Sequence, residues 1–208
     1  MAATTYPTDI SALVLVDVLN DFLSPEGKIN PRIKDQIEKH GFLETVSRLI
    51  SGARVAGVQI VYAPHGLHEH SFDDVFEVPV RMKVAMENHL FWEGESGSDF
   101  YQPFYPQRGD IVASRHRTFN AFQGTDLDEQ LRKRGIQKLV FAGLTSHTCV
   151  EGTGRQATEL GYHLTFIRDG VVEFTDEAHQ AAILISYPTF GHEVLTVEEF
   201  LASVVQVR

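Results

Sequence analysis

Cysteine is nearly absent from this chain of 208 residues, since Cys149 is the only one. A single thiol excludes a disulfide within the chain and is typical of a reducing compartment. No apolar run approaches the roughly 20 residues that a helix needs to cross a bilayer. The amino-terminal residues lack the basic segment and apolar stretch of a signal peptide. We therefore expect a cytoplasmic protein without a membrane partner.

Positive charge is also scarce: 18 Lys and Arg residues stand against 28 Asp and Glu residues, a formal net charge of −10. An acidic chain is repelled by phosphate backbones, which argues against a nucleic-acid partner. The hydrophobic content of 43% is ordinary for a globular protein that builds a full core. The length suits a single domain that spans residues 1–208.

Short apolar runs alternate with helical patterns along the chain. We expect strands at residues 12–16, 58–63, 110–113, 138–142, 163–167 and 193–195. Helical patterns occupy residues 33–56 (interrupted at Gly41), 126–134, 150–160, 176–186 and 197–204. Strands separated by helices indicate right-handed crossovers and a parallel sheet covered on both faces. The sequence therefore predicts an α/β fold: a single-domain, Rossmann-like three-layer sandwich with a mainly parallel six-stranded sheet.

Residues 65–106 form the least regular part of the sequence, with a helical pattern only at residues 80–88. Irregular segments of this length are typically lids or binding loops. The segment is rich in aromatic residues, among them Trp92. We expect it to cover the functional site and to shape a pocket for a partly apolar substrate.

Cys149 lies between the expected strand 138–142 and the expected helix 150–160. At such a strand–turn–helix junction an α/β sheet exposes side chains to a crevice, and helix amides lower the pKa of a thiol. This position indicates a nucleophile. The alternative interpretation is a small buried hydrophobic residue, as free cysteines often are.

Two other expected strands end in polar side chains. Asp17 follows strand 12–16, and Arg115 and His116 follow strand 110–113. A carboxylate, a cationic or imidazole group and a thiol in one crevice are the components of a cysteine hydrolase. The alternative for Asp17 is that it binds turn amides.

Three motifs, taken together and in order, resemble the isochorismatase-like cysteine hydrolases, which include nicotinamidases and N-carbamoyl amidohydrolases. They are residues 15–22 (LVDVLNDF), 119–127 (FNAFQGTDL) and 142–155 (AGLTSHTCVEGTGR). The likeness extends from about residue 11 to residue 200. It implies a hydrolase that cleaves an amide or related C–N bond of a small-molecule substrate through a cysteine thioester. It also implies that no cofactor is needed and that the chain forms a homo-oligomer.

The resemblance assigns roles to individual residues. Asp17 matches the general base and Cys149 the nucleophile. The Leu144–Thr145 bond matches a non-prolyl cis peptide bond, and the Thr145 and Cys149 amides match the donors that hold the oxyanion.

The third member of the family's triad, a lysine, is missing. Its position falls on His116 or, in one subgroup, on Ser114. A histidine can both stabilise a thiolate and carry a proton, whereas Arg115 stays charged and can only stabilise it. We favour His116 as the replacement, then Arg115, and then no functional replacement.

Four further side chains are candidates for contact with the substrate: Phe22, Trp92, Arg115 and His147. Three histidines follow strand 58–63, near the metal ligands of nicotinamidases: His65, His68 and His70. The Asp-x-His pattern of those enzymes is absent, so we predict no metal site.

Two other functions stay open at this point. In an isochorismatase-type enzyme the substrate is a vinyl ether, Asp17 donates the proton and Cys149 is a bystander. Alternatively, the missing lysine marks a non-catalytic member of the family that binds a small molecule or a partner.

Overall fold

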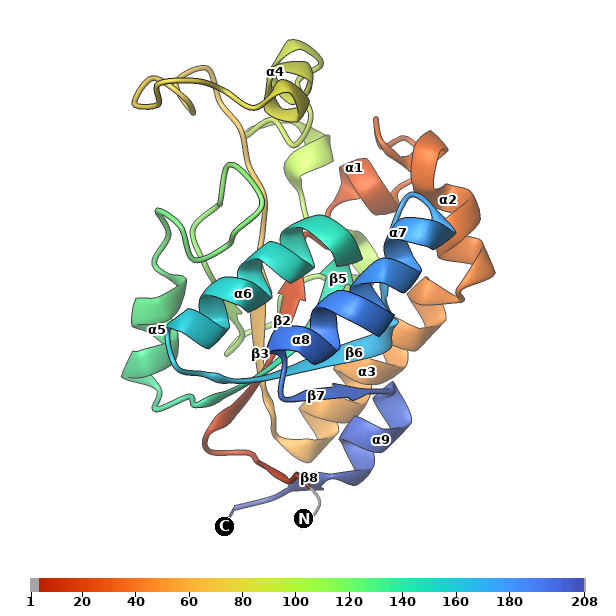
Figure 1. Cartoon of the computed structure of the whole chain (residues 1–208), viewed down its shortest axis with the longest axis vertical. Helices are drawn as coiled ribbons and strands as arrows, with labels where there is room; N and C mark the ends of the chain where they lie inside the picture. Colours follow the sequence, from red (N-terminus) through yellow and green to blue (C-terminus); the bar gives the residue numbers. More distant parts are fainter. Residues whose placement is uncertain (1–3, 208) are drawn as a thin grey trace.

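A six-stranded parallel sheet lies at the centre of the computed structural model, which describes residues 4–207 (Figure 1). The strand order is β4-β3-β2-β5-β6-β7, and every pairing between neighbours is parallel. The strands are β2 (Ser11–Val16), β3 (Gln59–Ala63), β4 (Ile111–Val112), β5 (Lys138–Leu144), β6 (His163–Val172) and β7 (Glu193–Leu195). The predicted fold class and all six expected strands are confirmed, with β6 five residues longer than its pattern indicated.

The central strands are apolar throughout because both faces of the sheet are covered. Every residue of β2 is buried. Successive side chains of a strand point to opposite faces. Accordingly, Leu13 and Leu15 pack in one hydrophobic cluster, whereas Val14 and Val16 pack in the other.

Two layers of helices form these clusters with the sheet. The first layer contains α2 (Asn30–Lys39), α3 (Phe42–Ala56) and α9 (Val197–Ala202). The second contains α5 (Leu127–Lys133), α6 (Glu151–Glu159), α7 (Asp176–Ala181) and α8 (Tyr187–Phe190), and Figure 1 shows α6, α7 and α8 in front of the sheet. Gly41, with φ of 57°, separates α2 from α3 at the predicted interruption. The three-layer sandwich is confirmed.

Some short elements carry no periodic signal and were not predicted. They are α1 (Asn20–Leu23) and the two-residue strands β1 (Tyr6–Pro7) and β8 (Val204–Val205), which pair with each other. This pairing explains why the expected last helix, 197–204, ends at Ala202: the chain leaves α9 to join the amino-terminal segment.

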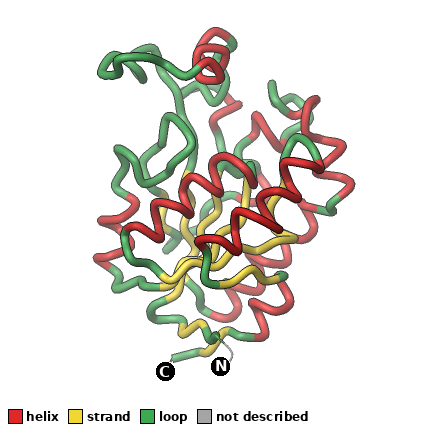
Figure 2. Tube along the Cα trace, in the orientation of Figure 1, coloured by secondary structure: helices red, strands yellow, loops and turns green. Residues whose placement is uncertain are grey.

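The irregular segment 65–106 lies at the end of the molecule toward which the β2 arrow points, and Figure 2 draws most of it as loop. The predicted helix is present as α4 (Val80–Glu87). Isolated backbone bridges, Leu67 to Trp92 and Leu19 to Phe100, tie the segment to itself and to the core. None of the helices in the described residues is long and apolar enough to span a membrane.

Candidate active site

Four neighbouring strands end at one edge of the sheet, and each is followed by a side chain that can take part in chemistry. Asp17 follows β2, His65 follows β3, His116 follows β4 and Cys149 follows β5. Ligand sites of parallel sheets form at this edge. Asp17, His65 and Cys149 line one cavity, and the His116 ring lies directly behind them.

Asp17 is fully buried, and its backbone lies in the left-handed region at φ of 52°. Asp tolerates this region better than most residues. Neighbouring Gly143 on β5 has φ of 121°, and a Cβ there would lie 2.1 Å from the Val16 carbonyl oxygen. Glycine at position 143 therefore allows β2 and β5 to come close, which places Asp17 beside the turn that carries Cys149.

His116 binds Asp17 in the manner expected of a replacement for the missing lysine. Its Nε2 lies 2.9 Å from Asp17 Oδ1, and neither side chain is exposed to solvent. Its Nδ1 lies 3.0 Å from the Thr118 carbonyl oxygen. Because a carbonyl only accepts, Nδ1 must carry a proton. One further proton then lies between His116 Nε2 and Asp17, held either as an imidazolium–carboxylate pair or as an imidazole–carboxylic acid pair.

The second carboxylate oxygen, Asp17 Oδ2, is buried and has no hydrogen-bond partner within residues 4–207. Buried polar atoms are nearly always paired, so an exception needs an explanation. A carboxylate oxygen without a hydrogen-bond partner has a free lone pair with which it can accept a proton during a reaction. Asp17 Oδ2 is such an oxygen.

Cys149 is 6% exposed and reaches the same carbonyl as His116, with its Sγ 3.9 Å from the Thr118 oxygen. Burial raises the pKa of the Cys149 thiol well above its ordinary value, and the nearby charge of Asp17 raises this pKa further. The expectation that helix amides lower this pKa is therefore wrong. Cys149 is a buried member of the π-helical turn Ser146–Val150 that precedes α6, and burial next to a carboxylate outweighs the amide dipoles.

The turn before Cys149 contains the cis peptide bond Leu144–Thr145 that the resemblance implies. The Thr145 carbonyl accepts hydrogen bonds of 3.2 Å from the Thr148 and Val150 amides. These bonds fix the turn, and Thr145, Thr148 and Cys149 all line the cavity. The oxyanion role of the Thr145 and Cys149 amides stays a prediction.

The second and third sequence motifs pack against each other. A Cβ at Gly152 of α6 would lie 2.3 Å from the Phe119 carbonyl oxygen, and the Ala121 amide donates to Thr153 Oγ1 at 3.0 Å. This close contact with α6 fixes the segment that supplies the Thr118 carbonyl, which contacts both the His116 ring and the sulfur.

The cavity has a volume of about 90 Å³. At about 10–15 Å³ for each water-sized group, this is room for a small molecule. Phe22 lies in its wall, as predicted, together with further aromatic side chains that the sequence did not single out: Phe91, Phe119 and Phe174.

His65 is a member of this wall that the sequence analysis considered only as a metal ligand. Its ring lies between those of Phe91, at 4.8 Å, and His116, at 4.9 Å. Burial, helped by the charge of His116, lowers the pKa of His65 to about 3. His65 is therefore a neutral hydrogen-bonding group at neutral pH. Its place at the end of the strand next to β2 was the signal that could have identified it.

Three predicted substrate contacts are not brought to the cavity, and we correct them here. Arg115 donates to the His65 carbonyl at 2.8 Å and lines a separate pocket. His147 is 47% exposed and binds Glu151. Trp92 stacks on His89 with 4.0 Å between ring centroids. Each of the three side chains is engaged elsewhere.

The histidines weighed as metal ligands are separated as well. His68 and His70 are exposed and lie in the pocket that Arg115 lines, whereas His65 faces the cavity beside Cys149. Within the described part of the chain, no three His, Cys, Asp or Glu side chains gather in a way that could hold a metal ion.

Comparison with known proteins agrees with this geometry. The isochorismatase domain profile matches residues 11–199. A ureidoacrylate amidohydrolase of Variovorax paradoxus is 30% identical over 206 residues, which cover 93% of this chain and 81% of that protein. An isochorismatase family protein of Bacillus subtilis is 42% identical over 115 residues, 53% of this chain and 59% of that one.

Solved structures share the fold. A cysteine hydrolase from Pseudomonas syringae superposes with a TM-score of 0.80 at 20% identity, covering 98% of both chains. N-carbamoylsarcosine amidase from Thermoplasma acidophilum gives 0.70 at 23% identity, covering 91% of this chain and 97% of that one. The resemblance stated from the three motifs is confirmed.

Proposed function

Because the chain belongs to the isochorismatase domain family of hydrolases, we propose that it cleaves a small amide or related C–N bond through a thioester on Cys149. The observation that carries this proposal is the buried Asp17–His116 pair, which shares one proton beside the Cys149 thiol. The names of an amidohydrolase and an amidase among the similar proteins support a C–N bond as the target.

The raised pKa of Cys149 means that the resting group is a thiol, so attack requires a base. Asp17 Oδ2 takes the thiol proton as the sulfur bonds to the substrate carbonyl carbon. The Asp17–His116 pair gains one positive charge at the moment when the substrate oxygen becomes negative. The Thr145 and Cys149 amides hold that oxyanion.

The oxyanion then collapses and the C–N bond breaks, while Asp17 passes its proton to the leaving nitrogen. Water attacks the thioester carbon and gives a proton to Asp17. The second oxyanion collapses to the acid, and the sulfur leaves and recovers its proton from Asp17. His116 acts throughout by sharing a proton with Asp17, which a lysine does in relatives of the family and which Arg115 cannot do.

The test compares Cys149→Ala with Asp17→Asn on a panel of small amides and ureides, with ammonia release as the readout. Both variants should stay folded and lose at least about 10³-fold in kcat. An acyl adduct on the single cysteine, trapped by acid quench and detected by mass spectrometry, is the second expected result. Full turnover in Cys149→Ala would overturn the proposal, because it would show that hydrolysis does not pass through a thioester on Cys149.

Homo-oligomerisation stays a prediction, which light scattering measures directly.

A further inference from the structure

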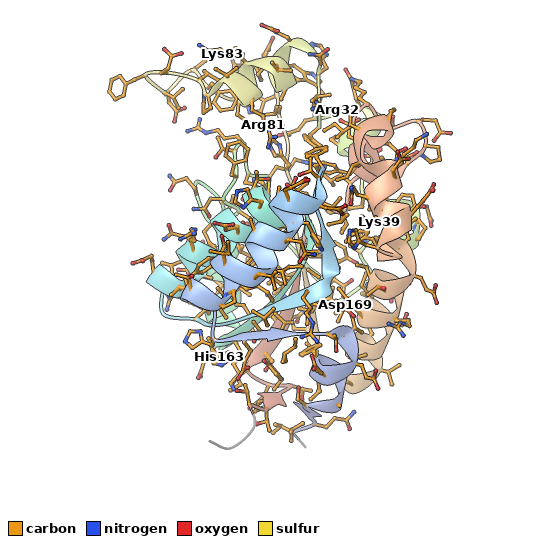
Figure 3. The ribbon with its side chains drawn as sticks, turned by 45° about the vertical axis from the view of Figure 1, so that its right-hand side comes forward. Arg32, Lys39, Arg81, Lys83, His163 and Asp169 are labelled. Carbon is orange, nitrogen blue, oxygen red and sulfur yellow. The ribbon has the colours of Figure 1, made fainter. Side chains whose placement is uncertain are left out.

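Two arginines from separate segments line the cavity. Arg32 belongs to α2 and Arg81 to α4, and both line the cavity that contains Cys149. Figure 3 shows them at the same end of the molecule, on elements that face each other. Both guanidinium groups lie over one aromatic ring, that of Phe174, at 5.5 Å and 5.8 Å from its centroid.

Neither guanidinium has a hydrogen-bond or ion-pair partner among residues 4–207, although carboxylates outnumber cations in this chain. Five other arginines do pair with carboxylates: Arg54, Arg117, Arg132, Arg155 and Arg168. The cavity wall holds one carboxylate, Asp17, and His116 already binds it. Arg32 and Arg81 therefore bring positive charge to a cavity whose one carboxylate is already bound.

We propose that the substrate carries a carboxylate at the end remote from its scissile bond, and that Arg32 and Arg81 bind this carboxylate. The inference that one end of the substrate holds a scissile C–N bond rests on the function proposed above. The inference that its other end is a carboxylate rests on the two arginines alone. A guanidinium placed over a ring still offers N–H groups to a carboxylate, in a planar arrangement that matches two oxygens. The apolar side chains that line the same cavity suit a short uncharged linker.

The test uses two ketones that differ only in charge at one end: levulinate (4-oxopentanoate) and 5-hydroxypentan-2-one. Neither contains a C–N bond, so neither is consumed by hydrolysis. Each is titrated for protection of Cys149 against iodoacetamide, with alkylation of the single cysteine followed by mass spectrometry. We expect levulinate to protect at about tenfold lower concentration than the alcohol, with the advantage shrinking as salt is added.

Two variants assign this selectivity to residues. In the double variant Arg32→Gln/Arg81→Gln the two ketones should protect at nearly equal concentrations. The control is a second double variant, Arg48→Gln/Arg108→Gln, which removes two positive charges from exposed arginines outside the cavity wall and should keep the wild-type ratio. Equal protection by the two ketones in the wild type, or undiminished selectivity in Arg32→Gln/Arg81→Gln, would overturn the proposal.

Turnover is measured separately on 3-ureidopropionate, which has both a ureide and a carboxylate. Charge-selective protection without hydrolysis of any amide or ureide would refute the hydrolytic function and leave the anion site standing. Hydrolysis that is equally fast for the neutral analogue (3-hydroxypropyl)urea, and unchanged in Arg32→Gln/Arg81→Gln, would refute the anion site and leave the hydrolase standing.

Discussion

The two walls of the cavity are built in different ways. Asp17, His116 and Cys149 each follow the end of a strand of the sheet within a few residues, and all three are buried. The other wall comes largely from the 65–106 segment, with Arg32 of α2 and Phe174 beside it. Within that segment α4 is short and carries exposed apolar residues such as Val80 and Val84. The sheet thus fixes the groups proposed for chemistry, while a segment outside the sheet supplies groups that select the ligand. Such a segment can change without disturbing the strands.

One buried carboxylate joins the two walls. Asp21, in α1, accepts hydrogen bonds from the backbone amides of Lys28, at 3.1 Å, and Phe91, at 2.5 Å. A Cβ at Gly97 would lie 2.4 Å from Asp21 Oδ1, so the 96–98 turn also packs directly on this group. Asp21 therefore holds the irregular wall at a fixed place relative to β2.

The largest effect should come from His116 in the sheet wall. His116→Ala leaves Asp17 buried without a partner, which should cost about 3–5 kcal/mol in the free energy of unfolding. His116→Gln can still donate to Asp17 but cannot share a proton, so it should restore most of this stability. Both variants should lose about 10²–10⁴-fold in kcat. Urea denaturation and steady-state kinetics measure the two quantities, and a His116→Gln enzyme with near-normal kcat would show that His116 only positions Asp17.

His65, where the walls meet, should make stability depend on pH. Its pKa is about 3 in the folded chain against an ordinary 6.5, so between these values the unfolded chain binds more protons. Stability from this group is complete above pH 6.5 and declines as pH falls toward 3. The folded state should lose about 2 kcal/mol between pH 7 and pH 5 from His65 alone. Urea denaturation of the wild type and of His65→Asn at both pH values isolates this contribution. An equal loss in the free energy of unfolding of the two proteins between pH 7 and pH 5 would contradict it.

The sheet wall could be predicted from the sequence because its signals are local. Runs such as residues 12–16 and 138–142 identify buried strands, and parallel strands bring the residues after their ends to one edge. Asp17, His116 and Cys149 were found in this way, with the family resemblance supplying their roles. Their backbone supports, such as Gly143 and Gly152, lie inside the same motifs.

The other wall could not be predicted, because its members are brought together by loops without a periodic pattern. Arg32 and Arg81 lie on different helices, and only the folded chain places both on Phe174. Trp92 was predicted to contact the substrate because aromatic residues in an irregular segment are typical of a binding pocket. Its ring stacks on His89 instead. The pKa of Cys149 was predicted in the wrong direction because the depth of burial is not visible in a sequence.

A change in the 65–106 wall should alter substrate affinity and leave the chemical step intact. Met82 of α4 is buried in the cavity wall, whereas Met86 on the same helix is outside it. Met82→Ala removes apolar contact with the ligand and should raise KM about three- to tenfold, with kcat within about twofold. Met86→Ala is the matched control and should leave both constants unchanged. A fall in kcat equal to the loss in kcat/KM would mean that α4 also supports the transition state.

The smallest effect is expected at His147, two residues from the sulfur in sequence and yet turned away from the cavity. Its ring binds Glu151, which also pairs with Arg155, on the surface of α6. A partly exposed pair at i,i+4 spacing contributes about 0.3–0.5 kcal/mol, and Glu151 keeps its partner Arg155, so His147→Ala should barely change the free energy of unfolding. We expect kcat/KM to stay within about twofold, because no atom of the ring lines the cavity. A tenfold loss of kcat/KM in this variant would instead mean that His147 contacts the substrate. His147 would then belong to the cavity wall with Cys149 and not to the protein surface.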